Sequence, residues 1–181
     1  MKKLVSFVCV MVMICFVSFG QVRVSHDYDK EADFTQFSSY NFTDEALKLP
    51  INDLNRKRLI AAINNELVNK GLTESNSPDL LIDIKVTADR KQTATATTDY
   101  YGRGYRYRWG GGFSSTNIDV HDYIEGTIFI DLISTASNQL VWQGRGVGTI
   151  SQDVKPEKRE KRINKAVTKI FSKYPPEKLV R

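Results

Sequence analysis

Cysteine is scarce in this 181-residue chain, and its two copies, Cys9 and Cys15, both lie near the N-terminus. The residues after position 20 therefore form neither a disulfide nor a thiolate metal site among themselves. Long apolar runs are scarce too, since after residue 20 none approaches the roughly 20 residues of a membrane-spanning helix. A domain without disulfides or thiolate metal sites depends on an apolar core. Removing the first 20 of the 181 residues leaves 161, which are enough to form such a core.

The first 20 residues have the pattern of a secretory signal peptide. Lys2 and Lys3 precede an apolar run over residues 4–19, and Ser18 and Gly20 are small residues at the −3 and −1 positions of a cleavage site. We therefore predict cleavage before Gln21 and a working protein that is exported, either periplasmic or associated with the outer membrane.

Two alternatives to cleavage remain open. The apolar run could stay in place as an N-terminal anchor, or the chain could be a lipoprotein modified at Cys15. Lipidation requires small residues before the modified cysteine, and Ile14 is large for the position next to the cut.

Charge of one sign is not in excess over most of the chain. Without Lys2 and Lys3 there are 24 Lys and Arg (26 less 2) against 21 Asp and Glu, a net charge near +3. Residues 155–181 differ, with ten basic and three acidic residues. We interpret this segment as the solvated outer face of a terminal helix. The alternative is a patch for an anionic surface, which would give peripheral membrane association.

Hydrophobic periodicity predicts a single domain over residues 21–181. Strands are expected at residues 22–28, 37–42, 79–88, 123–133 and 140–149, and helices at 52–71 and 156–174. The expected class is α+β with two layers: a largely antiparallel sheet and two helices packed on one face, in the order β-β-α-β-loop-β-β-α.

Three local patterns support this assignment. Asn52 or Asp53 can cap the first helix, and Gly71 can end it in the left-handed conformation. In the strand at 140–149, alternation predicts Leu140 and Trp142 on one side and Val141 on the other, with Trp142 in the core.

Several short stretches together resemble the domain of unknown function 4136 family. These are Asp27-Tyr28-Asp29, Ala32-Asp33-Phe34, Tyr40-Asn41-Phe42, Lys70-Gly71-Leu72, Pro78-Asp79-Leu80-Leu81-Ile82, Ile130-Asp131-Leu132-Ile133, Leu140-Val141-Trp142-Gln143-Gly144 and Tyr174-Pro175-Pro176. The resemblance covers nearly the whole chain after residue 20. It implies an exported bacterial envelope protein, commonly a lipoprotein, with an α+β domain and no catalytic residues to carry over.

A long polar, glycine-rich connection is predicted over residues 90–119, and loops of that length are usually functional or disordered. Within it, residues 99–113 include six aromatic residues and three arginines. Aromatic rings stack on sugars or bases, and arginine binds phosphate or carboxylate through two parallel hydrogen bonds. The candidate ligand-binding residues are Tyr100, Tyr101, Arg103, Tyr105, Arg106, Tyr107, Arg108 and Trp109. The expected partner is an envelope glycan, an anionic polymer or an envelope protein, and not nucleic acid. The alternative is a variable insertion without a ligand.

Few residues indicate metal binding or catalysis. His26 and His121 stand beside aspartates and could bind a divalent ion only if the fold brought them together. No G-x-S-x-G, H-E-x-x-H or P-loop motif occurs, so we assign no catalytic residue, cofactor or metal. We expect a non-enzymatic binding or structural module. A carboxylate-dependent hydrolase of an envelope polymer is the alternative, because a carboxylate pair needs no motif. Assembly through an exposed sheet edge is a third hypothesis.

Overall fold

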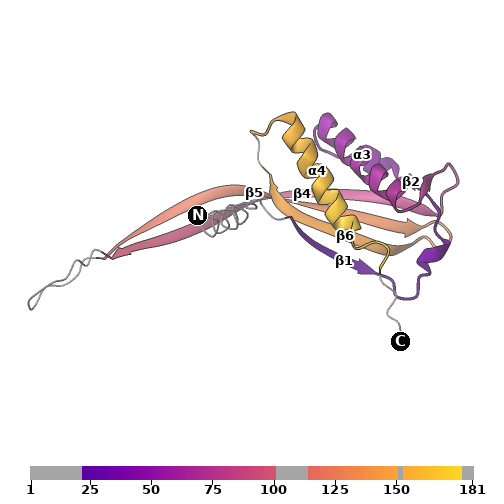
Figure 1. Cartoon of the computed structure of the whole chain (residues 1–181), viewed down its shortest axis with the longest axis horizontal. Helices are drawn as coiled ribbons and strands as arrows, with labels where there is room; N and C mark the ends of the chain where they lie inside the picture. The colour runs from indigo at the N-terminus through magenta and orange to yellow at the C-terminus, as the bar shows by residue number, and fades with distance from the viewer. Residues whose placement is uncertain (1–21, 101–113, 151–152, 177–181) are drawn as a thin grey trace, which may run out of the picture.

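The structure is a computed structural model that describes residues 22–100, 114–150 and 153–176. It has the α+β class expected from the sequence, with a six-stranded sheet and helices on one of its faces (Figure 1). The elements in chain order are β1 (Arg23–Tyr28), η2 (Phe34–Gln36), β2 (Ser39–Phe42), α2 (Asp44–Leu47), α3 (Asp53–Asn69), β3 (Thr73–Glu74), β4 (Leu80–Tyr100), β5 (Ser114–Ser134), β6 (Gln139–Ile150) and α4 (Pro156–Phe171).

The sheet is mixed, with strand order β1-β6-β5-β4-β2-β3. The pairs β1–β6, β6–β5 and β5–β4 are antiparallel, whereas β2 pairs in parallel with both β4 and β3. The parallel pairs follow from α3, which carries the chain back to the end of the sheet where β2 began. The short elements η2, α2 and β3 are additions to the expected order.

The two long helices begin and end where local chemistry favours it. The Asn52 side chain accepts a hydrogen bond from the backbone N–H of Leu54 at 3.0 Å, which confirms the predicted cap of α3. Gly71 has φ +87°, so the predicted left-handed C-terminal glycine is also confirmed. Pro156 occupies the first turn of α4, where its missing N–H costs nothing.

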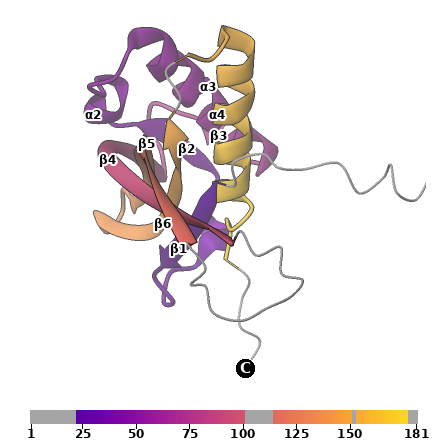
Figure 2. The ribbon, with the colours of Figure 1, turned by 90° about the vertical axis from the view of Figure 1, so that its left-hand side faces the viewer.

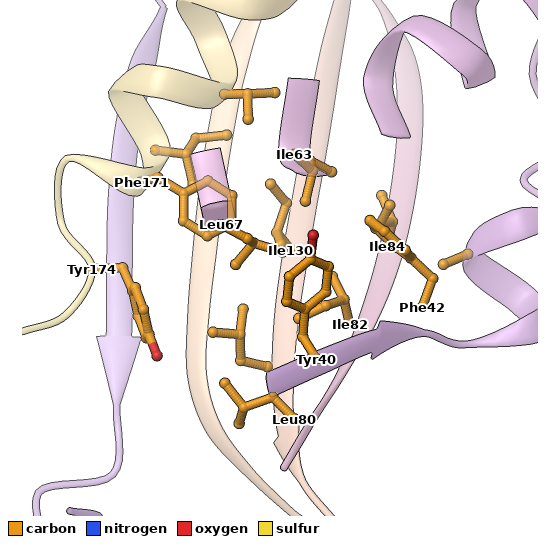
Figure 3. Close-up of a cluster of buried hydrophobic side chains, with 14 of the residues drawn as sticks. Tyr40, Phe42, Ile63, Leu67, Leu80, Ile82, Ile84, Ile130, Phe171 and Tyr174 are labelled. Atoms are coloured by element: carbon orange, nitrogen blue, oxygen red, sulfur yellow. The ribbon is translucent and has the colours of Figure 1, made fainter. Parts of the chain in front are cut away.

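The core fills the space between the two helices and the sheet (Figure 3). The central strands contribute alternate residues to it, because successive side chains of a strand point to opposite faces. The sheet supplies Tyr40, Leu80, Ile82, Ile84, Ile130 and Leu132, and the helices supply Leu59, Ile63, Leu67, Val167, Ile170 and Phe171. The predicted apolar faces of 79–88 and 123–133 therefore face the core where β4 and β5 lie under the helices, but Ala88, which was expected on the first of them, is exposed.

A β-bulge overturns the prediction for Leu140. The register shifts between Leu132 and Ile133, so Leu132 pairs with Trp142 and Ile133 pairs with Leu140, leaving Val141 as the extra residue. Leu140 is 48% exposed, whereas Trp142 is fully buried and Val141 is 4% exposed. Leu140 and Trp142 do not share a face, because one extra residue between them reverses the alternation.

Asp79 joins three parts of the sheet immediately before β4. Its Oδ2 accepts hydrogen bonds from the backbone N–H and hydroxyl groups of both Ser38 and Ser39, at 2.8 to 3.0 Å. Its backbone carbonyl accepts from the N–H of Thr135 at 2.9 Å, in the turn between β5 and β6. The hydrogen bond from the Ser38 backbone, followed by those from the Ser39 and Ser38 hydroxyls, lowers the pKa of Asp79 to about 2.

We expect Asp79→Asn to unfold at a lower temperature than the unaltered protein at pH 7. A carboxyl group whose pKa is lower in the folded state stabilises the protein above its unfolded pKa, near 3.8, and loses this effect as pH falls towards about 2. Thermal unfolding followed from pH 7 to pH 2 measures it. The variant should lose less stability between about pH 4 and pH 2, and the exposed aspartate variant Asp89→Asn is the control. An acid-induced loss equal to that of the unaltered protein would contradict the assignment.

The long connection predicted over residues 90–119 is wrong at both of its ends. Strand β4 continues to Tyr100 and β5 starts at Ser114, and the two remain paired without a register shift over the whole length. Residues 101–113 lie outside the described residues. The composition of these strand segments resembles that of a loop, because they project from the core and residues 91–97 are exposed.

Candidate functional site

Strands β4 and β5 extend beyond the rest of the sheet as a two-stranded ribbon (Figures 1 and 2). Toward the far end of the ribbon, the pairing of β5 with β6 stops at Ile124, which lies opposite Ile150. Beyond it, residues 91–100 pair only with residues 114–123, and we call this ribbon the arm. Ten residues at about 3.3 Å each make it about 30 Å long. Its described side chains on β4, residues 91–97, are all exposed.

The arm includes one of the candidate ligand-binding residues. Tyr100 is the last residue of β4, and its backbone lies opposite Ser114 at the far end of the arm. The other candidates, Tyr101, Arg103, Tyr105, Arg106, Tyr107, Arg108 and Trp109, lie outside the described residues. The sequence predicts this aromatic and basic segment in a loop on the domain. The register of β4 and β5 places Tyr100 and Ser114, the described residues that flank it, about 30 Å from the body of the sheet.

The arm has an alternating pattern that is not among the features expected from the sequence. Ala94 and Ala96 face one side of the ribbon together with Val120, which is 57% exposed. The other side presents Thr93, Thr95 and other polar residues. Alternation of this kind is typical of a sheet with one buried face, yet among the described residues nothing packs on the arm. The Thr-Ala-Thr-Ala-Thr run at 93–97 was the available sequence signal.

The base of the arm is held by an ion pair and lined by a shallow pocket. Arg23 Nη2 on β1 lies 2.6 Å from Glu125 Oε2 on β5, across the end of β6. The pocket has a volume of about 500 Å³ and is lined by Arg90, Asp122, Tyr123, Ile124, Thr149 and Ile150. Its lining mixes charges and apolar atoms around an open rim, so it offers no enclosed, water-free site for chemistry.

A cluster of charges lies on the sheet face opposite the helices. Asp131 is 8% exposed and accepts hydrogen bonds from Lys85 Nζ at 3.1 Å and Gln143 Nε2 at 2.6 Å. Asp83, directly opposite Asp131 in the register, lies 3.3 Å from Lys85 and accepts from the Thr43 hydroxyl at 3.0 Å. The hydrogen bond to Asp131, followed by that to Asp83, raises the pKa of Lys85.

Asp83 and Asp131 are the adjacent carboxylates to consider for the hydrolase hypothesis. Both oxygens of Asp131 accept hydrogen bonds, and a lysine lies between the two carboxylates. A general acid must present its proton to a substrate, whereas protein donors occupy both oxygens of Asp131 and Lys85 Nζ lies between the two carboxylates. The arrangement therefore supports a structural ion cluster that satisfies polar groups on the sheet face.

The two histidines are far apart. His26 on β1 aligns with Gly144 on β6, which in turn aligns with Ile130 on β5. His121 is nine residues further along β5, which is about 30 Å in a strand. Among the described residues, no group of three or more His, Cys, Asp and Glu side chains is placed to hold a metal ion.

Helix α4 presents a basic outer face. Ile163, Val167 and Ile170 face the sheet, and Lys158, Lys161 and Arg162 are exposed on the other side. The amphipathic helix predicted for this segment is thus present, and its basic residues form a second candidate surface. Within residues 22–100, 114–150 and 153–176, no helix combines the length and apolar character needed to cross a bilayer.

Comparisons with solved structures show the fold. A PDZ domain protein from Parabacteroides distasonis matches with a TM-score of 0.52 and 18% identity, over 97% of this chain and 40% of that one. The chain thus spans less than half the length of that protein. Two structures of PelC dodecamers from Paraburkholderia phytofirmans match at 12% identity over 85% of this chain and 95% and 96% of theirs, with TM-scores of 0.41 and 0.40.

Sequence comparison confirms the family resemblance. No curated protein matches the chain. The family model of the domain of unknown function DUF4136 matches residues 24–176, which include both long helices and every described strand of the sheet apart from the first residue of β1. The chain therefore belongs to the DUF4136 family.

Proposed function

We propose that this chain is an exported, non-enzymatic binding module of the bacterial cell envelope and that the arm is its contact element. The N-terminal signal pattern and the family resemblance support export to the envelope. The observation that supports the contact element is the arm itself, ten residue pairs that project from the sheet, with residues 91–97 of β4 exposed.

The energetics of the arm favour a role in contact. A two-stranded ribbon alone in water is marginally stable, and three or more strands or a packed layer are normally needed. The arm is attached to a stable sheet at one end, but none of its side chains for which burial is described is buried in the core. The length of the arm and its alternating pattern do not contribute to the packing of the body. Both are suited to binding a partner that covers one side of the arm.

The chemistry of the partner is suggested by the residues at the far end of the arm. Tyr100 and the candidates that follow it combine aromatic rings with arginine, which suits an envelope glycan, an anionic polymer or an envelope protein. The basic face of α4 is a second surface with the same preference for anionic partners. Reaching 30 Å from the body would let the arm contact a partner that the rest of the domain does not touch.

Shortening the arm tests the proposal. In an antiparallel pair only alternate residues form backbone hydrogen bonds with the partner strand. The carbonyl of Asp79 accepts from Thr135, on the β5 side, whereas the carbonyl of Ile82 accepts from Thr43, on the opposite side. The odd-numbered residues of β4 are therefore the ones that bond to β5. Lys91 and Tyr123 therefore form a hydrogen-bonded pair that a two-residue Asn-Gly turn can close, replacing residues 92–122. We expect the shortened protein to keep its thermal midpoint and to lose the components that the unaltered protein retains from native envelope extract.

The matched variant replaces Tyr105, Arg106, Tyr107 and Trp109 with alanine and keeps the full arm. Equal loss in both variants would assign the contact to the aromatic and basic segment, and loss only in the shortened protein would assign it to the ribbon. Retention of the same components by the shortened, folded protein would refute the arm as the contact element. The mass of the protein recovered from an envelope fraction tests export, since cleavage before Gln21 removes the first 20 residues.

A further inference from the structure

The outer edge of β4 is unpaired along the arm. Strand β2 pairs with β4 only as far as Ile82, and beyond Arg90 no described element lies beside it. The carbonyl of Ile82 points outward, where it accepts from Thr43, so the even residues of β4 direct their backbone groups away from β5. The backbone N–H and C=O groups of Gln92, Ala94 and Ala96 therefore form a row along this edge that no described strand pairs with.

This edge lacks the residues that usually prevent strand pairing. Natural edge strands carry charges, proline or bulges, but residues 92–98 are Gln-Thr-Ala-Thr-Ala-Thr-Thr, without charge, proline or glycine. The register of β4 with β5 has no bulge over this segment. The other edge of the arm is different, because β5 has Asp119 and Asp122 over the same length.

We propose that the partner of this edge is a second copy of the chain, with the two β4 strands antiparallel about a twofold axis at Thr95. This proposal rests on the arm as the contact element and names one of its partners. The shared element is a four-stranded sheet made of two arms, with the two bodies at its opposite ends. Such an interface is isologous, so each contact occurs twice.

Charge selects the register. A twofold axis perpendicular to the ribbon pairs residues of the same face, so the axis passes through one residue of β4. With Thr95 on the axis, Lys91 of each copy lies opposite Asp99 of the other, which gives two pairs of opposite charge. With Ala94 on the axis, Asp89 would oppose Asp99, and like charges in directly opposed positions are destabilising. With Ala96 on the axis, Asp99 would oppose Thr93, and no opposite charges meet among residues 90–100.

The side chains on the two faces are compatible with this register. Thr95 meets Thr95 and Thr93 meets Thr97 on one face, and threonine is favoured in paired strands. On the other face Ala94 meets Ala96 in each half, next to the exposed Val120. The alternation that is unused in the single chain then produces one continuous stripe of small and apolar residues across four strands.

Cysteine scanning tests the register. A pair that is not hydrogen bonded places its Cα atoms about 4.5 Å apart, within the range of a disulfide. We expect the full chain carrying Thr95→Cys, with Cys9→Ser and Cys15→Ser so that residue 95 is its one cysteine, to form a disulfide-linked dimer under mild oxidation, with residue 95 joined to residue 95 in mass spectrometry of the peptides. The matched control, Thr93→Cys, lies opposite Thr97 and should remain unlinked. Equal linking at both positions would refute the register.

Sedimentation of the full chain tests the pairing itself. Ala94→Pro removes an outward N–H without taking a bond from β5, so it should abolish the dimer, whereas Ala94→Val keeps the N–H and should retain it. Lys91→Glu or Asp99→Lys should each weaken the dimer by roughly tenfold, and the double reversal should restore it. Within one chain Lys91 lies opposite Tyr123 and Asp99 lies opposite Ser115 in the register, so neither reversal removes a directly opposed pair of charges.

The outcomes separate this proposal from the function proposed above. A chain that stays monomeric at all concentrations, or a dimer that survives Ala94→Pro, would refute the paired arms. A monomer that still retains envelope components through its arm would refute only the pairing. A dimer that follows the predicted pattern but retains no envelope component would support the pairing and leave the arm without a heterologous ligand.

Discussion

Trp142→Ala should lower the free energy of unfolding by about 3–5 kcal/mol, the range for removing a large aromatic side chain from a core. Trp142 is fully buried on β6, where it contacts Phe171 and Tyr174. Its ring stacks on Phe171 of α4 with centroids 5.6 Å apart and meets the edge of Tyr174 at 5.4 Å. Alanine would leave a cavity where the sheet, α4 and the segment after α4 meet, and all three would lose contacts.

Chemical denaturation followed by circular dichroism measures this loss, since removing Trp142 also removes a fluorescent reporter. Trp142→Phe should cost much less, because it keeps most of the ring. The indole N–H of Trp142 has no hydrogen-bond partner among the described residues, so its removal also relieves a desolvated donor. Leu140→Ala on the same strand is the control for an exposed side chain. A loss for Trp142→Ala no larger than that of Leu140→Ala would contradict the proposed core.

Gly144→Ala is expected to destabilise the protein by about 1–3 kcal/mol, the usual cost of overpacking a core. A Cβ at Gly144 would lie 2.4 Å from the Cγ2 of Ile170 and 2.4 Å from the Cη2 of Trp142. Neither neighbour can yield easily, because Ile170 is held in α4 and the Trp142 ring is stacked on Phe171. The helix can approach β6 this closely only because residue 144 has no side chain.

Gly148→Ala on the same strand is the matched control. A Cβ there would meet only Val22 at 3.5 Å, which is an ordinary contact, so its effect should be small. Both substitutions lose the same backbone freedom of glycine in the unfolded state, and their difference therefore isolates the clash. Equal midpoints of denaturation for the two variants would show that α4 does not pack on Gly144 as described.

The parts of the fold that could be predicted are those specified by local chemistry. The cap at Asn52 and the left-handed Gly71 follow from side-chain hydrogen bonding and from the absence of a Cβ, and both depend on neighbours in the sequence. The alternation from Leu80 to Ile84 predicts a core face because every second residue of a strand points to the same side of the sheet, and Leu80, Ile82 and Ile84 are all buried. The family could be recognised because these short patterns occur together in order.

The features that were missed depend on contacts between distant residues. The bulge at Val141 is set by pairing with Leu132 and Ile133 on another strand, and alternation within β6 alone cannot show it. The arm was missed because residues 90–100 resemble a loop in composition, and only their register with residues 114–124 makes them a strand. Residue type alone selects the candidate residues, whereas only the register of β4 with β5 shows that Tyr100, the one among them that the structure describes, ends a strand.

The continuity of β4 and β5 from the arm into the core has a mechanical consequence. These are the two central strands of the sheet, so a force applied at the far end of the arm enters the body between its other strands. The hydrogen bonds between β5 and β6 run perpendicular to the strands. A pull along the arm would load the whole row of these bonds together in shear, and would not open them one after another. Tension along the direction of the arm is therefore opposed by all the hydrogen bonds between β5 and β6 at the same time.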